Sequence, residues 1–204
     1  MKQQWPALQK ALLLVLGCIG FRLLSSLFPD VIPDISPLMA VAFVGAMYLP
    51  VRWGWLVGPS TLLITELAFL KINYVSEGAM FSWWTPISLL FYMLVGGLGV
   101  LLARHKSLGK IAAGSVLCST LFYVAANTYS WAIYLQPTSN PGYPFSLAGW
   151  WQANTVGLPG WVPTWVFLRN GISGDLFFAF VLLLILDRGL LFAGRSASVL
   201  SRAA

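Results

Sequence analysis

Five polar side chains within or beside long apolar stretches are the best candidates to bind a polar solute. They are Glu66, Asn127, Arg169, Asn170 and Asp175. A carboxylate deep in a membrane costs roughly 2.5–3.5 kcal/mol on insertion scales, so each such group needs a specific reason. We expect these groups to converge and bind the polar parts of a solute. A structural alternative is that Glu66 or Asp175 pairs with Arg169 and that Asn127 bonds a neighbouring helix.

Tryptophan is unevenly distributed among the predicted loops and helix ends. Trp161, Trp165 and five candidate ligand-binding residues lie on one side, and three tryptophans lie on the other. Tryptophans are expected at both membrane interfaces, so an interfacial belt is one interpretation. The other is that some of the rings line a cavity for a flat organic ligand. The five candidates are Trp83, Trp84, Trp131, Trp150 and Trp151.

Motifs for enzymatic or metal chemistry are absent from the sequence. It contains no HExxH, GxSxG, P-loop or paired-carboxylate motif, and its one histidine, His105, lies between basic residues. Cys18 and Cys118 lie inside apolar stretches and form no CxxC pair. We therefore predict no catalytic residues, no enzymatic activity, no cofactor and no metal site, with Met80 as a remote candidate for a soft ligand. An embedded enzyme that uses Glu66 or Asp175 as an acid is the least favoured reading.

The composition predicts that these residues are held by membrane helices. Of the 204 residues, 58% are hydrophobic and 9% are charged, against about 25% charged in a soluble domain. A spanning helix needs roughly 20 apolar residues. We predict an all-α polytopic membrane protein, a single transmembrane domain over 1–204 with six spans. The predicted spans are 8–28, 38–50, 54–70, 86–103, 111–135 and 165–187, and the second is short.

The basic residues predict how the helices are oriented. Nine of the twelve lie on the side that holds both termini, while the opposite loops hold only Lys71 and Arg169. The positive-inside rule then places both termini in the cytoplasm, with the chain in a bacterial inner membrane. The positive net charge of +6 thus reflects topology and attraction to the inner leaflet of the lipid bilayer, and we predict no nucleic-acid partner.

Two further features bear on partners and on the site. The outer loop 136–164 is rich in proline, glycine and aromatic residues, which predicts a folded cap rather than a flexible tether. Ala42 and Ala46 form a small-xxx-small pair in the second segment. Such a pair indicates either close helix packing or an interface with a partner subunit.

Several stretches resemble a family of small bacterial membrane proteins that are similar to the S components of energy-coupling-factor (ECF) vitamin transporters. The resemblance implies a six-helix bundle whose outer loops cap a solute pocket. It also implies either an energy-coupling module as partner or a solitary transporter. The relevant stretches are 28–37 leading into 40–46, 119–122 with Asn127 and Trp131, 143–149, and Arg169–Asn170 with 174–176.

The best-understood relative in that family is the solitary cobalamin transporter BtuM, in which a cavity cysteine ligates cobalt. Neither Cys18 nor Cys118 falls in an outer loop, so this chemistry is not expected. S components that share an energy-coupling module carry a small-residue pair on their first helix, whereas Ala42 and Ala46 lie on the second segment. We expect uptake of a small solute of the vitamin or corrinoid class. The alternative is a non-transporting scaffold or accessory subunit that docks a protein through its outer aromatic loop.

Overall fold

Five helices in the described part of the chain are long and apolar enough to cross a membrane. The computed structural model describes residues 6–28, 35–72 and 82–191 and is all-α there. The bounds of the five helices agree with the predicted spans to within a few residues, which confirms a membrane protein. They are α1 (Ala7–Leu27), α3 (Val51–Lys71), α5 (Trp84–Leu102), α6 (Leu108–Ile133) and α8 (Trp165–Leu186).

The predicted second span is instead a short buried helix, so the described chain has five candidate spans and not six. It consists of α2 (Leu38–Phe43), which tightens into the 3-10 helix η1 (Gly45–Tyr48). Eleven helical residues rise only about 16 Å, roughly half the thickness of the hydrocarbon core. Leu49 is extended, and Pro50 caps α3, so the helix ends there.

The helices surround this short segment. Helix α2 contacts α1, α3, α5, α6 and α8, and all six of its residues are buried. Phe43 is fully enclosed because Gly99 of α5 faces its carbonyl oxygen and Gly114 of α6 faces its ring. A Cβ at either glycine would overlap Phe43. The absence of these two side chains therefore lets α5 and α6 close around α2.

Ala42 and Ala46 have the packing role that was one of the two expectations for them. The Ala42 side chain faces Gly58, and the Ala46 side chain faces Gly54 and Gly99. Both alanines are fully buried, so neither is exposed to a partner subunit.

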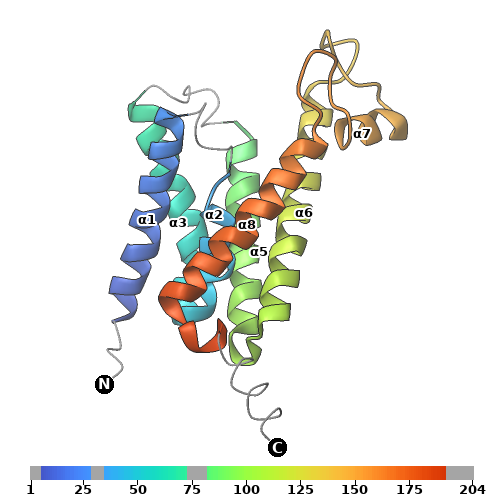
Figure 1. Ribbon diagram of the computed structural model, residues 1–204. Helices are drawn as coiled ribbons and strands as arrows, with labels where there is room; N and C mark the ends of the chain where they lie inside the picture. The colour runs from blue at the N-terminus through green and yellow to red at the C-terminus, as the bar shows by residue number, and fades with distance from the viewer. Residues whose placement is uncertain (1–5, 29–34, 73–81, 192–204) are drawn as a thin grey trace, which may run out of the picture.

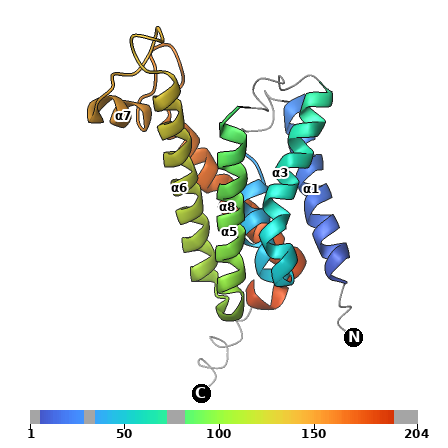
Figure 2. The same ribbon diagram turned by 180° about the vertical axis from the view of Figure 1, so that it is seen from behind.

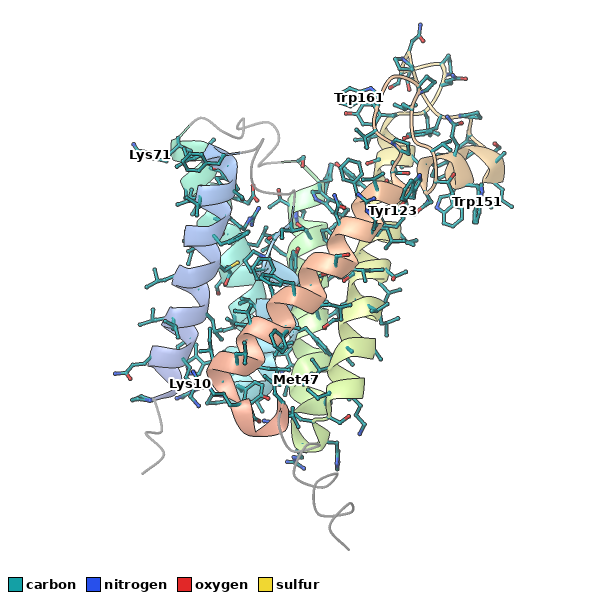
Figure 3. The ribbon with its side chains drawn as sticks, viewed as in Figure 1. Lys10, Met47, Lys71, Tyr123, Trp151 and Trp161 are labelled. Carbon is teal, nitrogen blue, oxygen red and sulfur yellow. The ribbon has the colours of Figure 1, made fainter. Side chains whose placement is uncertain are left out.

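The two ends of the bundle differ in structure (Figures 1 and 2). Helix α1 begins and α8 ends at the same end, where Lys10 and Met47 also lie, and Lys71 lies at the other (Figure 3). The far end of α6 continues into a cap that contains the short helix α7 (Leu147–Ala153). The short 3-10 helix η2 (Ala103–His105) precedes α6. The assignment of the cap to the outer side remains a prediction from the charges.

Gly114→Ala tests the packing around Phe43. The added Cβ would press on a fully buried ring, and overpacking of this kind costs about 1–3 kcal/mol. Gly109→Ala on the same helix is the matched control, because a Cβ there meets no atom within 4 Å. We expect Gly114→Ala to lower the midpoint of thermal unfolding in detergent and Gly109→Ala to leave it unchanged or raise it. Equal midpoints would contradict the packing described here.

Candidate functional site

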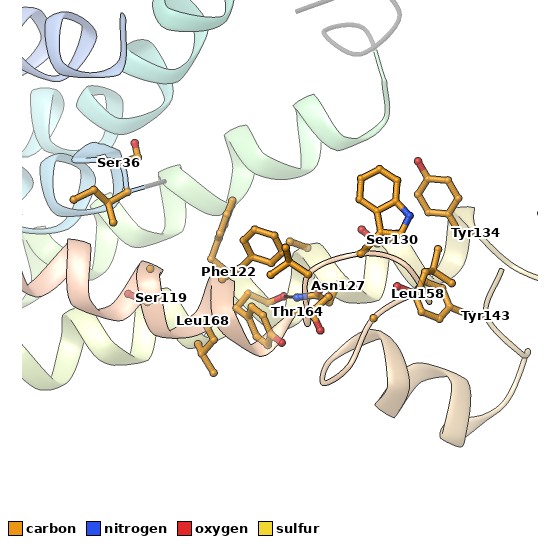
Figure 4. A pocket seen from close by; sticks show the side chains of 18 of the residues that line it. Ser36, Ser119, Phe122, Asn127, Ser130, Tyr134, Tyr143, Leu158, Thr164 and Leu168 are labelled. Atoms are coloured by element: carbon orange, nitrogen blue, oxygen red, sulfur yellow. Dashed lines mark hydrogen bonds between the residues drawn. The ribbon is translucent and has the colours of Figure 1, made fainter. Parts of the chain in front are cut away.

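A pocket of about 820 Å³ lies beneath the cap, between α6, α8 and the start of α2 (Figure 4). This volume is typical of sites for small organic ligands, which measure roughly 300–1,000 Å³. Most of its lining is apolar or aromatic, with a few polar groups. The aromatic lining residues are Tyr92, Phe122, Tyr123, Tyr134, Tyr143, Trp161 and Phe167.

One face of α6 forms a wall of the pocket. Ser119, Tyr123, Asn127, Ser130 and Tyr134 all line it and follow one another at spacings of three or four residues. Residues at this spacing lie on the same side of a helix. The periodic polar and tyrosine face is visible in the sequence. Of these five residues, Asn127 alone is among the predicted site residues.

Helix α8 supplies the opposite wall and carries the pocket inward. Thr164, Leu168, Gly171 and Asp175 line it at the same helical spacing. Asp175 is the eleventh of the 22 residues in α8. The pocket therefore extends from the cap to the middle of a helix long enough to span a membrane.

Asp175 links α8 to α6 at the inner end of the pocket. Its side chain is 6% exposed, and Ser119 Oγ donates a hydrogen bond to its Oδ2. Ser119 Oγ also lies 2.8 Å from the backbone oxygen of Ser115, one turn earlier on α6. Among the described residues, no cation lies within ion-pair distance of Asp175.

Asn127, the other predicted site residue that lines the pocket, bonds within its own helix. Its Nδ2 donates to the backbone oxygen of Tyr123 at 2.9 Å, so the expected bond to a neighbouring helix is not formed. Tyr143 lies in the cap and also lines the pocket. Burial raises the pKa of Tyr143, so its phenol is protonated at neutral pH.

The cap is folded, as predicted for 136–164, and it is attached to α6. Tyr123 Oη donates to the backbone oxygen of Asn154 at 2.8 Å. The indole Nε1 of Trp150 donates to Thr128 Oγ1 at 2.9 Å. The 29 residues of the loop contain no charged side chain. The cap is therefore held over the pocket by neutral hydrogen bonds.

None of the five candidate tryptophans lines the pocket. Trp84 packs against Phe122 and Tyr129, with ring centroids 5.7 and 5.2 Å apart. Trp131 stacks on Phe145 and donates to a cap carbonyl, and Trp150 bonds to α6 as described above. Trp84 therefore packs against the pocket residue Phe122, while Trp131 and Trp150 join the cap to α6.

Trp83 and Trp151 face outward. Their side chains are 80% and 63% exposed, which fits the interfacial interpretation better than the cavity interpretation. The tryptophan that lines the pocket is Trp161, which lies in the cap (Figure 3). Trp161 is one of the predicted outer tryptophans but not one of the five predicted ligand-binding tryptophans.

Glu66 lies away from the pocket, in an ion pair with Arg22, which is not among the predicted site residues. Arg22 Nη2 of α1 lies 3.2 Å from Glu66 Oε1 of α3. The Arg22 guanidinium also lies over the Phe69 ring, 5.2 Å from its centroid. The partly buried pair joins α1 to α3, so the expected pair between Glu66 and Arg169 does not exist.

Arg169 and Asn170 also lie outside the pocket. The guanidinium of Arg169 is exposed and donates through Nε and Nη2 to Asn170 Oδ1, at 3.3 and 3.2 Å. It also lies 5.7 Å from the centroid of the Trp165 ring. Neither Glu66 nor Asp175 is its partner. Arg169 directly follows the pocket residue Leu168 and lies two residues before Gly171, but its side chain is exposed outside the pocket.

Metal chemistry gains no support from the described residues. They contain no group of three or more His, Cys, Asp or Glu side chains that could hold a metal ion. Cys18 and Cys118 are buried as free thiols and do not line the pocket. Met80, the remote candidate for a soft ligand, lies outside the described residues.

Glu66→Gln tests the ion pair between α1 and α3. The change leaves the partly buried Arg22 guanidinium without its counter-charge, and loss of one partner of a buried pair costs about 3 kcal/mol. We expect a lower midpoint of thermal unfolding for Glu66→Gln and no change for the exposed control Arg169→Gln. The double variant Arg22→Leu/Glu66→Leu should recover most of the loss. An unchanged midpoint in Glu66→Gln would show that the pair is unimportant to stability.

Comparison with known proteins identifies a family but gives no function. No curated protein and no solved structure matches the chain. A family model matches residues 2–188, which is most of the chain, and its description is "Family of unknown function (DUF6580)". The protein therefore belongs to the DUF6580 family.

Proposed function

We propose that this protein binds a small, ring-containing micronutrient from the cap side and takes part in its uptake, in the manner of an S component. The observation that carries the proposal is the pocket itself. It begins beneath a folded cap and ends at Asp175, halfway along a helix that is long enough to span a membrane.

The depth of the pocket suits transport better than surface binding alone. Transporters commonly place the solute near the middle of the bilayer, so that a limited movement of helices exposes it to the other side. Here the two walls come from α6 and α8, which are joined near the inner end of the pocket by the Ser119–Asp175 hydrogen bond. A relative movement of these two helices is the simplest way to open the pocket inward.

The pocket lining favours an organic solute without metal ligation. Aromatic rings offer flat apolar surfaces, and Ser130 and Asn127 offer neutral hydrogen-bonding groups. No cysteine or histidine is among the described lining residues, so thiolate ligation of a corrinoid has no residue to perform it. A vitamin-sized heterocycle is the preferred solute. Both an energy-coupling partner and a solitary mechanism are compatible with this site.

Gly171→Leu tests whether this pocket holds the solute. A Cβ at Gly171 meets no atom within 4 Å, so a larger side chain can extend into the pocket without a backbone clash. Ser173→Leu is the matched control, because Ser173 is an exposed residue of the same helix that does not line the pocket. We expect mass spectrometry to detect a small molecule that co-purifies with the wild type and with Ser173→Leu, and that is lost from Gly171→Leu.

A second candidate function is that of a membrane scaffold that docks a protein through the cap. It is favoured by Phe145, Leu147 and Trp151, which are exposed apolar residues of the cap. The same purification separates the two functions. A stoichiometric protein partner that is lost on Trp151→Ser, together with no pocket-dependent small molecule, would replace the uptake proposal with the scaffold.

A further inference from the structure

Asp175 is a buried acid that the rest of the described chain does not neutralise. Only 6% of its surface is exposed to solvent. The ion pair found among the described residues, Arg22 with Glu66, does not include it. Its hydrogen bond from Ser119 uses Oδ2. Asp175 therefore presents a carboxyl group to the pocket with no basic residue beside it.

No basic side chain lines the pocket among the described residues, and Asp175 is the one acidic residue of that lining. Burying an uncompensated carboxylate is costly, and such groups inside membrane proteins usually have a partner of opposite charge. Here the position where that partner would lie is the pocket interior. A bound cation would supply the missing charge.

Aromatic side chains line the pocket close to Ser119 in the sequence of α6. Phe122 and Tyr123 lie three and four residues beyond Ser119, the hydrogen-bond partner of Asp175, and all four residues line the pocket. Figure 4 shows Ser119 and Phe122. Tyr92 of α5 also lines it, and its ring centroid is 5.5 Å from that of Phe122. The negative faces of aromatic rings attract organic cations within about 6 Å of the ring centroid. An acidic side chain and aromatic rings in one pocket therefore offer both of the interactions that bind an organic cation.

We infer that the pocket takes a small organic cation that bears a ring, with its ammonium or protonated ring nitrogen against Asp175 and its ring among Phe122, Tyr123 and Tyr92. This inference rests on the proposed function and narrows its solute. It also excludes anionic solutes, because a carboxylate or phosphate on the solute would lie near Asp175 with no basic lining residue to balance its charge.

Three indole compounds of similar size separate charge from ring binding. Tryptamine is cationic at neutral pH, 3-methylindole is neutral and indole-3-propionate is anionic. Binding of each to the full-length protein in phosphatidylcholine nanodiscs is measured by calorimetry at pH 7. We expect tryptamine to bind about tenfold or more tightly than indole-3-propionate, which corresponds to about 1.4 kcal/mol or more.

Asp175→Asn removes the charge and keeps an oxygen that can accept the hydrogen bond from Ser119. We expect it to weaken tryptamine binding about tenfold, to leave 3-methylindole binding unchanged and to remove the preference for the cation. Gly171→Leu should abolish binding of both compounds and so shows that they occupy the pocket. The comparison of the three compounds on the wild type needs no variant, so it still decides the question if Asp175→Asn does not fold.

Two different results would overturn the inference. In the first, indole-3-propionate or 3-methylindole binds as tightly as tryptamine, and Gly171→Leu abolishes all binding. This result would refute the preference for a cation and keep the pocket as a solute site. The cation site would be refuted if none of the three compounds bound to the wild type, or if Gly171→Leu left their binding unchanged. The proposed function would then lose its support as well.

Discussion

The enclosure of one short helical segment determines the shape of the whole bundle. Leu38–Tyr48 is apolar and surrounded by other helices, and Phe43 at its centre fits only because glycines of α5 and α6 carry no side chain towards it. Met39 near the start of this segment and Ser36 just before it form part of the pocket wall.

Polar contacts in the bundle are divided between two roles. The pair of Arg22 and Glu66 joins α1 to α3 and is a charge-compensated contact within the scaffold. The hydrogen bond between Ser119 and Asp175 joins α6 to α8, and it leaves a formal charge uncompensated beside a cavity. In the first arrangement the two opposite charges compensate each other within the protein, while Arg22 Nη1 is buried without a hydrogen-bond partner among the described residues. The second leaves an acidic group facing the pocket, which is why the proposed cation site is assigned to α6 and α8.

The sequence was informative where local pattern decides the outcome and uninformative where pairing across the fold decides it. Hydropathy located five of the helices, and the spacing of polar residues and tyrosines on α6 is visible in the sequence. The partner of Glu66 could not be predicted, because Arg22 is 44 residues away and their meeting depends on how α1 packs on α3. Likewise, the sequence does not reveal whether an indole such as Trp150 turns to a cavity or donates to a neighbouring hydroxyl.

The neutral character of the cap has a consequence for how fast a solute is captured. Because the 136–164 loop carries no charged side chain, it creates no strong field that would attract or repel a charged molecule over a distance comparable to the Debye length, about 8 Å at physiological salt. The association rate should then depend little on ionic strength. Discrimination between solutes would arise after entry, from how long each one stays.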